Sequence, residues 1–142
     1  MRSFVVDASV AVKWLVDEPH SDAAAKLLED GLLLAAPELI YAEVSNALWA
    51  IAQRGNIGTA ELREALDLLA DTPLIVPSPM KQLIPAAARL AADLDHPMYD
   101  CMYLALAIQE QRPVVTADKR FFNVVREHPY LSEQLVLLES LA

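Results

Sequence analysis

The sequence predicts an α/β domain in which helices cover both faces of a parallel sheet. Five short apolar runs alternate with longer stretches of helical periodicity. Several of these runs show no alternation of polar with apolar residues, which is typical of strands buried on both faces. The chain has 142 residues, only 3 of them Gly, and no linker-like tract. One domain over residues 1–142 is therefore expected.

The strands are predicted from the short apolar runs, and strand–helix–strand repetition makes the sheet parallel. In chain order the expected strands are Phe4–Val6, Leu32–Ala35, Leu74–Val76, Val114–Thr116 and Leu135–Leu137. The expected helices are Val10–Val16, His20–Glu29, Pro37 to about Arg54, a helix from Thr59, Lys81–Leu94, the segment HPMYDCMYLALAIQEQ, and a last short helix from near Asp118.

Local signals support the helix boundaries. Pro19 separates the first two helices, and Gly55 is a plausible stop for the long third helix, whose apolar residues recur at helical spacing. Thr59 begins the next helix, with Glu61 in its first turn. Pro97 occupies a first-turn position of the HPMYDCMYLALAIQEQ helix.

The composition limits the possible functions. The net charge of −9 argues against a stand-alone nucleic-acid binder, because neutralising phosphates requires Lys and Arg. It suits a metal site or a basic protein partner, although acids also simply keep a chain soluble. Cys101 is the single cysteine, so no intrachain disulfide forms. With no signal-peptide pattern and no membrane-spanning run, a cytoplasmic protein is expected.

Four acidic residues occupy unusual positions. Asp7 follows the first strand, Glu43 lies within the long apolar helix, Asp100 lies in the first turns of its helix, and Asp118 follows VVTA. Chemistry in parallel α/β folds collects beyond the carboxyl ends of the strands. Each acid also has a structural explanation. Either Asp7 or Ser9 could cap the helix that follows the first strand, and Asp118 could cap its own helix. Asp100 could be a favourable charge at a helix N-terminus, and Glu43 could lie on a solvent face.

If the four carboxylates converge, their mutual repulsion favours binding of a cation. Oxygen ligands without His or Cys select hard ions, Mg²⁺ or Mn²⁺ rather than Zn²⁺. Such an ion with open coordination positions suits phosphate chemistry.

These residues resemble a known family. The segments VVDASV, AEVSNAL, YDCMYLALA and VVTADKRF, in this order, are similar to the four acidic motifs of PIN-domain ribonucleases, and more narrowly to the VapC toxins of toxin–antitoxin pairs. The resemblance covers nearly the whole chain.

The resemblance implies a three-layer α/β/α fold with a parallel sheet of about five strands, and Mg²⁺- or Mn²⁺-dependent endonucleolytic cleavage of RNA. It implies that Asp7 and Asp100 are the firmest metal ligands and that Glu43 and Asp118 complete the site directly or through water. Ser9 and Thr116 would orient carboxylates. A type II system further implies a homodimer inhibited by a VapB-like antitoxin with a basic tail.

Two other functions remain open. The chain could be a non-catalytic dimeric module whose acids serve a basic partner. It could also be a phosphohydrolase with Asp7 as nucleophile, although Ser9 stands where such enzymes usually carry a second Asp. Lys13, Lys119 and Arg120 are either RNA contacts or surface charge. No catalytic role is assigned to His20, His96 or His128.

Overall fold

Four parallel strands form the sheet in the computed structural model, which describes residues 2–29 and 32–141. The two ends of the expected 1–142 domain therefore lie outside the described residues. The strands are β1 (Ser3–Val6), β2 (Leu33–Ala35), β3 (Val114–Thr116) and β4 (Leu135–Leu137). Their order across the sheet is β2-β1-β3-β4, and every pair is parallel. The predicted α/β class with a parallel sheet is confirmed.

The expected fifth strand at Leu74–Val76 is wrong as a sheet strand. Only Ile75 pairs there, through a single parallel bridge with Ala35 at the outer edge of β2. Proline lacks the N–H that a ladder requires, and Pro73 and Pro77 bracket this segment. Ile75 is 50% exposed, so it also lacks the two-sided burial of the other strands. The described sheet therefore has four strands rather than about five.

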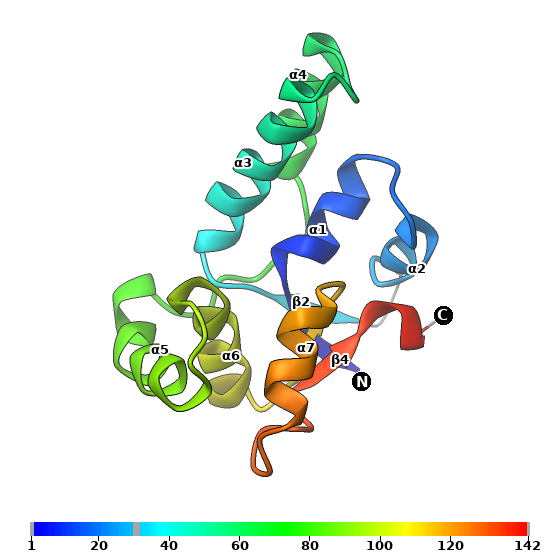
Figure 1. Cartoon of the computed structure of the whole chain (residues 1–142). Coiled ribbons are helices and arrows are strands. Elements are labelled where there is room, and N and C mark those ends of the chain that lie inside the picture. The colour runs from blue at the N-terminus through cyan, green and yellow to red at the C-terminus, as the bar shows by residue number, and fades with distance from the viewer. Residues whose placement is uncertain (1, 30–31, 142) are drawn as a thin grey trace.

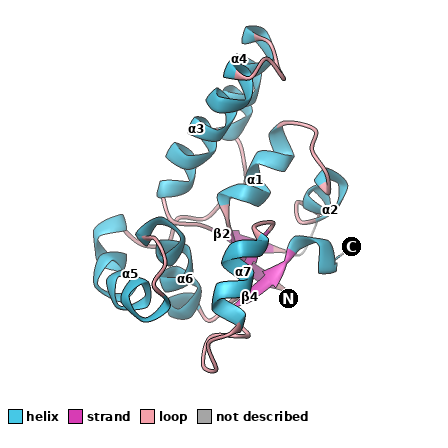
Figure 2. Cartoon of the chain, viewed as in Figure 1, coloured by secondary structure: helices cyan, strands magenta, loops and turns pink. Residues whose placement is uncertain are grey.

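The helices flank the sheet (Figure 2), close to the positions expected from periodicity. They are α1 (Ala8–Leu15), α2 (Ser21–Lys26), α3 (Leu39–Gln53), α4 (Thr59–Leu69), α5 (Met80–Leu94), α6 (Met98–Glu110), α7 (Lys119–Arg126) and a short unpredicted 3₁₀ helix, η1 (Leu138–Leu141). In Figure 1, α3 and α4 form a pair that projects away from the sheet, and α5 lies beside α6. No helix within residues 2–29 and 32–141 is long and apolar enough to cross a membrane.

Three helices end in a left-handed residue that reverses the chain. Gly55 has φ 80°, which confirms the predicted stop after α3, and Asp95 and Gln111 adopt the same region with φ 48° and 55°. After Asp95, the amide of His96 donates back to the carbonyl of Ala91 at 3.2 Å, the six-to-one bond of a Schellman motif. The turn into α6 is therefore fixed by backbone hydrogen bonds.

The core lies between the sheet and its helices. The last three residues of β1 and all of β3 are buried, as β-branched and aromatic residues in a covered parallel sheet should be. In α6, the run from Tyr103 to Ala107 is at most 3% exposed on every side, which makes α6 an interior helix rather than an amphipathic surface helix. The start of this helix brings Asp100 to the cavity that Asp7 and Asp118 line at the ends of β1 and β3.

Candidate active site

All four predicted acids line one cavity of about 240 Å³. Asp7 comes from the end of β1, Glu43 from α3, Asp100 from the first turn of α6 and Asp118 from the residue before α7. The two strand-end acids are neighbours because β1 and β3 pair directly, with Val6 opposite Val115. The convergence of the four side chains is thus a property of the fold, while their roles as ligands or catalysts stay a prediction.

Asp7 is held by two hydroxyl groups. Its Oδ2 accepts a hydrogen bond from Thr116 Oγ1 at 2.6 Å and another from Ser9 Oγ at 3.0 Å. Its backbone amide donates to the carbonyl of Val115 at 3.2 Å, which ties the end of β1 to β3. Although Asp7 occupies the cap position of α1, its side chain makes no capping bond. The capping explanation therefore fails for Asp7, and its carboxylate instead accepts hydrogen bonds from Ser9 and Thr116.

The same two hydroxyls connect Asp7 to the loop after β3. Ser9 Oγ accepts from the amide of Ala117 at 3.0 Å, and Thr116 Oγ1 accepts from the amide of Asp118 at 3.0 Å. Each hydroxyl has one proton, and both protons point at Asp7 in this arrangement. Both bonds reach Oδ2, so within the described residues Oδ1 receives no hydrogen bond and is available to a ligand.

Burial and neighbouring charge strongly perturb Asp7. The residue is 5% exposed, and this burial, with smaller contributions from Asp100 and Glu43, raises its pKa to about 7. The hydrogen bonds from Thr116 and Ser9 favour the charged form and oppose this rise in pKa. The carboxylate is therefore poised between its two protonation states near neutral pH.

Glu43 is held by a residue that the sequence did not identify. Tyr103, which is fully buried in α6, donates its hydroxyl proton to Glu43 Oε1 at 2.6 Å. Burial, followed by the charge of Asp100, raises the pKa of Glu43, and the Tyr103 bond lowers it. Burial and the adjacent Glu43 charge raise the pKa of the Tyr103 hydroxyl, so it remains a donor. Glu43 is half-buried rather than on a free solvent face.

Asp100 is held by His96, to which no role was assigned. His96 Nε2 lies 2.6 Å from Asp100 Oδ2, one helical turn away. The imidazole is only 6% exposed and stacks on Phe121 of α7, with ring centroids 5.2 Å apart. The i, i+4 spacing across the Pro97 helix start was the available signal for this pair.

Asp118 combines both explanations offered for it. Its Oδ1 accepts from the amide of Phe121 at 3.1 Å, so it caps α7. It also lines the acidic cavity. Phe121 therefore links two of the acids: its amide donates to Asp118, and its ring stacks on His96, which contacts Asp100.

The donor set fits a hard cation in part. The side chains offer carboxylate oxygens, and the raised pKa values of Asp7 and Glu43 reflect mainly burial, with a smaller contribution from neighbouring acids that a cation would relieve. However, no three His, Cys, Asp or Glu side chains in the described ranges stand close enough together to hold one ion. This arrangement suits Mg²⁺, which usually takes one or two carboxylates and keeps several waters, better than an ion that needs a closed cage.

Comparisons with known proteins identify the family of this chain. The PIN domain family model matches residues 4–127. The VapC ribonuclease Mb0985 of Mycobacterium bovis and the ribonuclease VapC9 of Mycobacterium tuberculosis are each 34% identical over 119 residues, which cover 82% of this chain and 86% of the relative.

Solved structures share the fold at lower identity. PAE2754 from Pyrobaculum aerophilum superposes with a TM-score of 0.68 at 22% identity, covering 99% of this chain and 92% of its own. VapBC2 from Rickettsia felis, solved bound to a promoter DNA fragment, gives a TM-score of 0.63 at 15% identity, covering 95% and 96%. The match over most of the chain, together with four acids around one cavity at the strand ends, shows that this chain belongs to the PIN-domain family and is of the VapC type.

Proposed function

We propose that the chain is a Mg²⁺- or Mn²⁺-dependent endoribonuclease that acts as the toxin of a type II toxin–antitoxin pair. The observation that carries the proposal is the gathering of Asp7, Glu43, Asp100 and Asp118 around one cavity. The sequence relatives named VapC ribonucleases support the same activity.

Asp7 and Asp100 are the proposed direct ligands of the cation. Each has one oxygen occupied by a hydrogen bond, from Thr116 and Ser9 to Asp7 and from His96 to Asp100, and a second oxygen that is free of such bonds within the described chain. Glu43 and Asp118 would then act through bound water, which is consistent with the lack of a closed three-residue cage among residues 2–29 and 32–141.

Hydrolysis requires water to attack phosphorus while the bond from phosphorus to the leaving oxygen breaks. Glu43 is the proposed acceptor of the proton of the attacking water. Its pKa is raised, and Tyr103 holds Oε1 so that Oε2 remains available. The cation, when bound, supplies positive charge that stabilises the charge developing on the phosphate oxygens.

The proposed partners follow from charge and from the structural neighbours. One neighbour is a toxin–antitoxin complex from Klebsiella pneumoniae, with a TM-score of 0.63 at 11% identity over 95% of this chain and 97% of that one. With a net charge of −9, this chain suits a VapB-like antitoxin whose basic tail enters the acidic cavity. A homodimer located in the cytoplasm completes the proposal.

RNA cleavage by the purified chain tests the activity. Single-stranded RNA should be cut in the presence of Mn²⁺ or Mg²⁺, with EDTA abolishing cleavage and Asp7→Asn removing it. Asp93→Asn, an exposed acid on α5, is the matched control and should leave cleavage intact. Cleavage that survives in Asp7→Asn would contradict the proposal, and a phosphate trapped on Asp7 would favour the phosphohydrolase instead.

A further inference from the structure

The acidic cavity does not end at the four carboxylates. It borders a second cavity of about 360 Å³, with which it shares Ser9, Val12 and Ala47. This second cavity lies between α1 and α3 and runs to Arg54, the residue after α3. We call it the α1–α3 groove.

The groove follows from the spacing of residues on α3. Glu43, Ala47, Ala50 and Arg54 fall on one stripe of that helix, which runs about 16 Å along the axis at 1.5 Å per residue. The two alanines are too small to fill the space between the helices, so the stripe is hollow between its charged ends. A Schellman turn at Gly55, with the amide of Asn56 donating to the carbonyl of Ile51 at 3.2 Å, fixes the chain where Arg54 stands.

Two cations, Lys13 and Arg54, and one acid, Glu18, line the groove, which leaves it one net positive charge, whereas four acids line the cavity beside it. Lys13, whose side chain is 11% exposed, contacts Glu18 at 3.4 Å. Arg54 is exposed, and no acidic side chain of the described residues lies within ion-pair distance of it.

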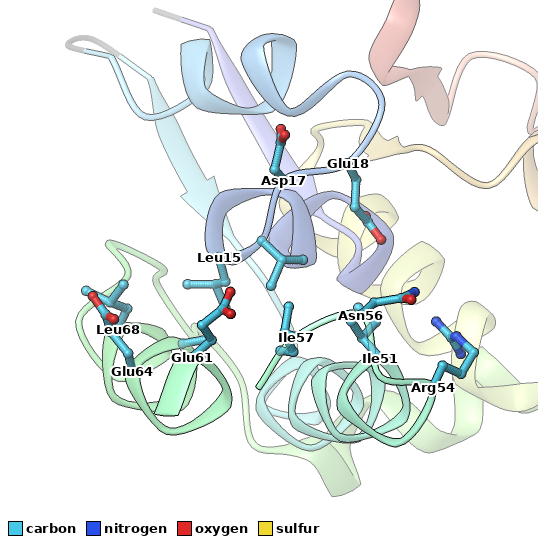
Figure 3. A pocket seen from close by; sticks show the side chains of 12 residues that line it. Leu15, Asp17, Glu18, Ile51, Arg54, Asn56, Ile57, Glu61, Glu64 and Leu68 are labelled. Atoms are coloured by element: carbon cyan, nitrogen blue, oxygen red, sulfur yellow. The ribbon is translucent and has the colours of Figure 1, made fainter. Parts of the chain in front are cut away.

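Beyond Arg54 a third cavity of about 450 Å³ repels phosphate. Figure 3 shows that Glu18 and Arg54 stand at one end of this cavity, while Glu61 and Glu64 line it from α4. Four acidic residues therefore line this cavity, together with one basic residue, Arg54; the acids are Asp17, Glu18, Glu61 and Glu64. A polyanion that leaves the acidic site therefore finds favourable charge along the groove and unfavourable charge after it.

We propose that the α1–α3 groove binds the backbone of single-stranded RNA adjacent to the scissile phosphate, with Lys13 and Arg54 contacting phosphates. This inference rests on the proposed ribonuclease function. Glu18 opposes the binding, because it partly neutralises Lys13. Phosphate contacts position a strand without reading its bases, so the groove contributes affinity and register rather than sequence preference.

The test measures RNA binding separately from cleavage. In a Glu43→Gln background with Mg²⁺, which keeps the proposed ligands Asp7 and Asp100 but removes the proposed proton acceptor, binding of a labelled single-stranded RNA oligonucleotide is followed by fluorescence anisotropy at several salt concentrations. Arg54→Gln and Lys13→Gln should each weaken binding several-fold and reduce the slope of log K against log salt by about 0.7, the value for one phosphate contact on a single strand. Glu18→Gln should strengthen binding.

Arg63→Gln is the matched control, because Arg63 is an exposed arginine of α4 that lines none of the three cavities. Its slope should equal that of the parent, and the effects of Arg54→Gln should be equal on oligonucleotides of different sequence. If Arg54→Gln and Lys13→Gln leave the slope unchanged while the wild-type chain cleaves RNA, the groove inference is wrong and the nuclease stands. If the wild-type chain does not cleave RNA, the proposed function fails first.

Discussion

In the absence of a divalent cation, the folded chain should lose stability as the pH rises. The substitution Asp7→Asn should abolish this loss. The pKa of Asp7 lies at about 7 in the folded state, whereas its ordinary value is 3.8. A raised pKa means that the folded state binds the proton more tightly than the unfolded state does. The contribution of Asp7 protonation to the free energy of unfolding is complete when the pH is below the ordinary pKa of 3.8, and it disappears as the pH rises through about 7.

The magnitude follows from the two pKa values. Each tenfold change in proton affinity corresponds to about 1.4 kcal/mol, so the whole effect is about 4 kcal/mol between strongly acidic and alkaline pH. Between about pH 5.5 and pH 8, a practical range for this chain of pI 4.6, the expected loss in the free energy of unfolding is about 2 kcal/mol. Asparagine keeps an oxygen that accepts from Thr116 and Ser9 but does not titrate.

Urea unfolding in EDTA, followed by circular dichroism across this pH range, measures the effect. The wild-type chain should lose stability with rising pH, and Asp7→Asn should lose about 2 kcal/mol less. Asp93→Asn, exposed on α5, should follow the wild-type curve. Parallel curves for wild type and Asp7→Asn would show that burial does not perturb this carboxyl, and the argument for a strained acidic site would fall.

Three further changes test the supports of the site and the core. Tyr103→Phe removes the donor to Glu43, and RNA cleavage and Mn²⁺ affinity by calorimetry should both fall, at a stability cost of roughly 1–2 kcal/mol measured by urea unfolding. His96→Phe keeps the stack on Phe121 but loses the bond to Asp100, so Mn²⁺ binding should weaken while the melting temperature stays near that of wild type. Loss of Mn²⁺ binding in His96→Gln as well would indicate that ring packing, not the hydrogen bond, matters. Leu104→Ala opens a cavity in buried α6 and should cost roughly 2–5 kcal/mol in urea without altering the pH dependence.

Sequence periodicity located most of the fold because local and tertiary preferences agree in this chain. The predicted strands Val114–Thr116 and Leu135–Leu137 match β3 and β4, where buried apolar runs leave one interpretation. The Leu74–Val76 run has the same composition but lies between prolines, and it forms only a bridge at the sheet edge. Apolar composition alone does not distinguish a strand from an extended edge segment, whereas proline placement does.

The acids of the site could be predicted because each interrupts an apolar context at a position that the parallel topology makes special. Asp7 and Asp118 end neighbouring strands, so their proximity follows from the strand order alone. Tyr103 could not be found in this way, since its partner Glu43 is 60 residues away on another helix. His96 was overlooked because a turn-like context does not reveal that its ring is buried against Phe121.

The same burial that destabilises the acidic site would favour the binding of a cation there. Burial, with a smaller contribution from repulsion among Asp7, Glu43 and Asp100, raises the pKa of the first two, so at neutral pH the empty site costs folding free energy. Any ligand that binds only the folded state increases the free energy of unfolding by RT ln(1 + c/Kd), where c is the concentration of free ligand. Added Mg²⁺ should therefore reduce the pH-dependent loss of stability in the wild-type chain and have little effect on Asp7→Asn.

The acidic site also disfavours RNA, because its carboxylates repel the phosphate at which cleavage is proposed. A divalent cation at the site would offset two of its negative charges and give a phosphate a positive contact, and Lys13 and Arg54 line the groove that borders the site. On the proposed function both features are needed. Without a cation the groove would end at a negative cavity, and without the groove a cation would hold a single phosphate. RNA affinity should consequently fall when either the cation or the two basic side chains of the groove are removed. When both are removed, the repulsion between the acidic site and the RNA limits the affinity that remains.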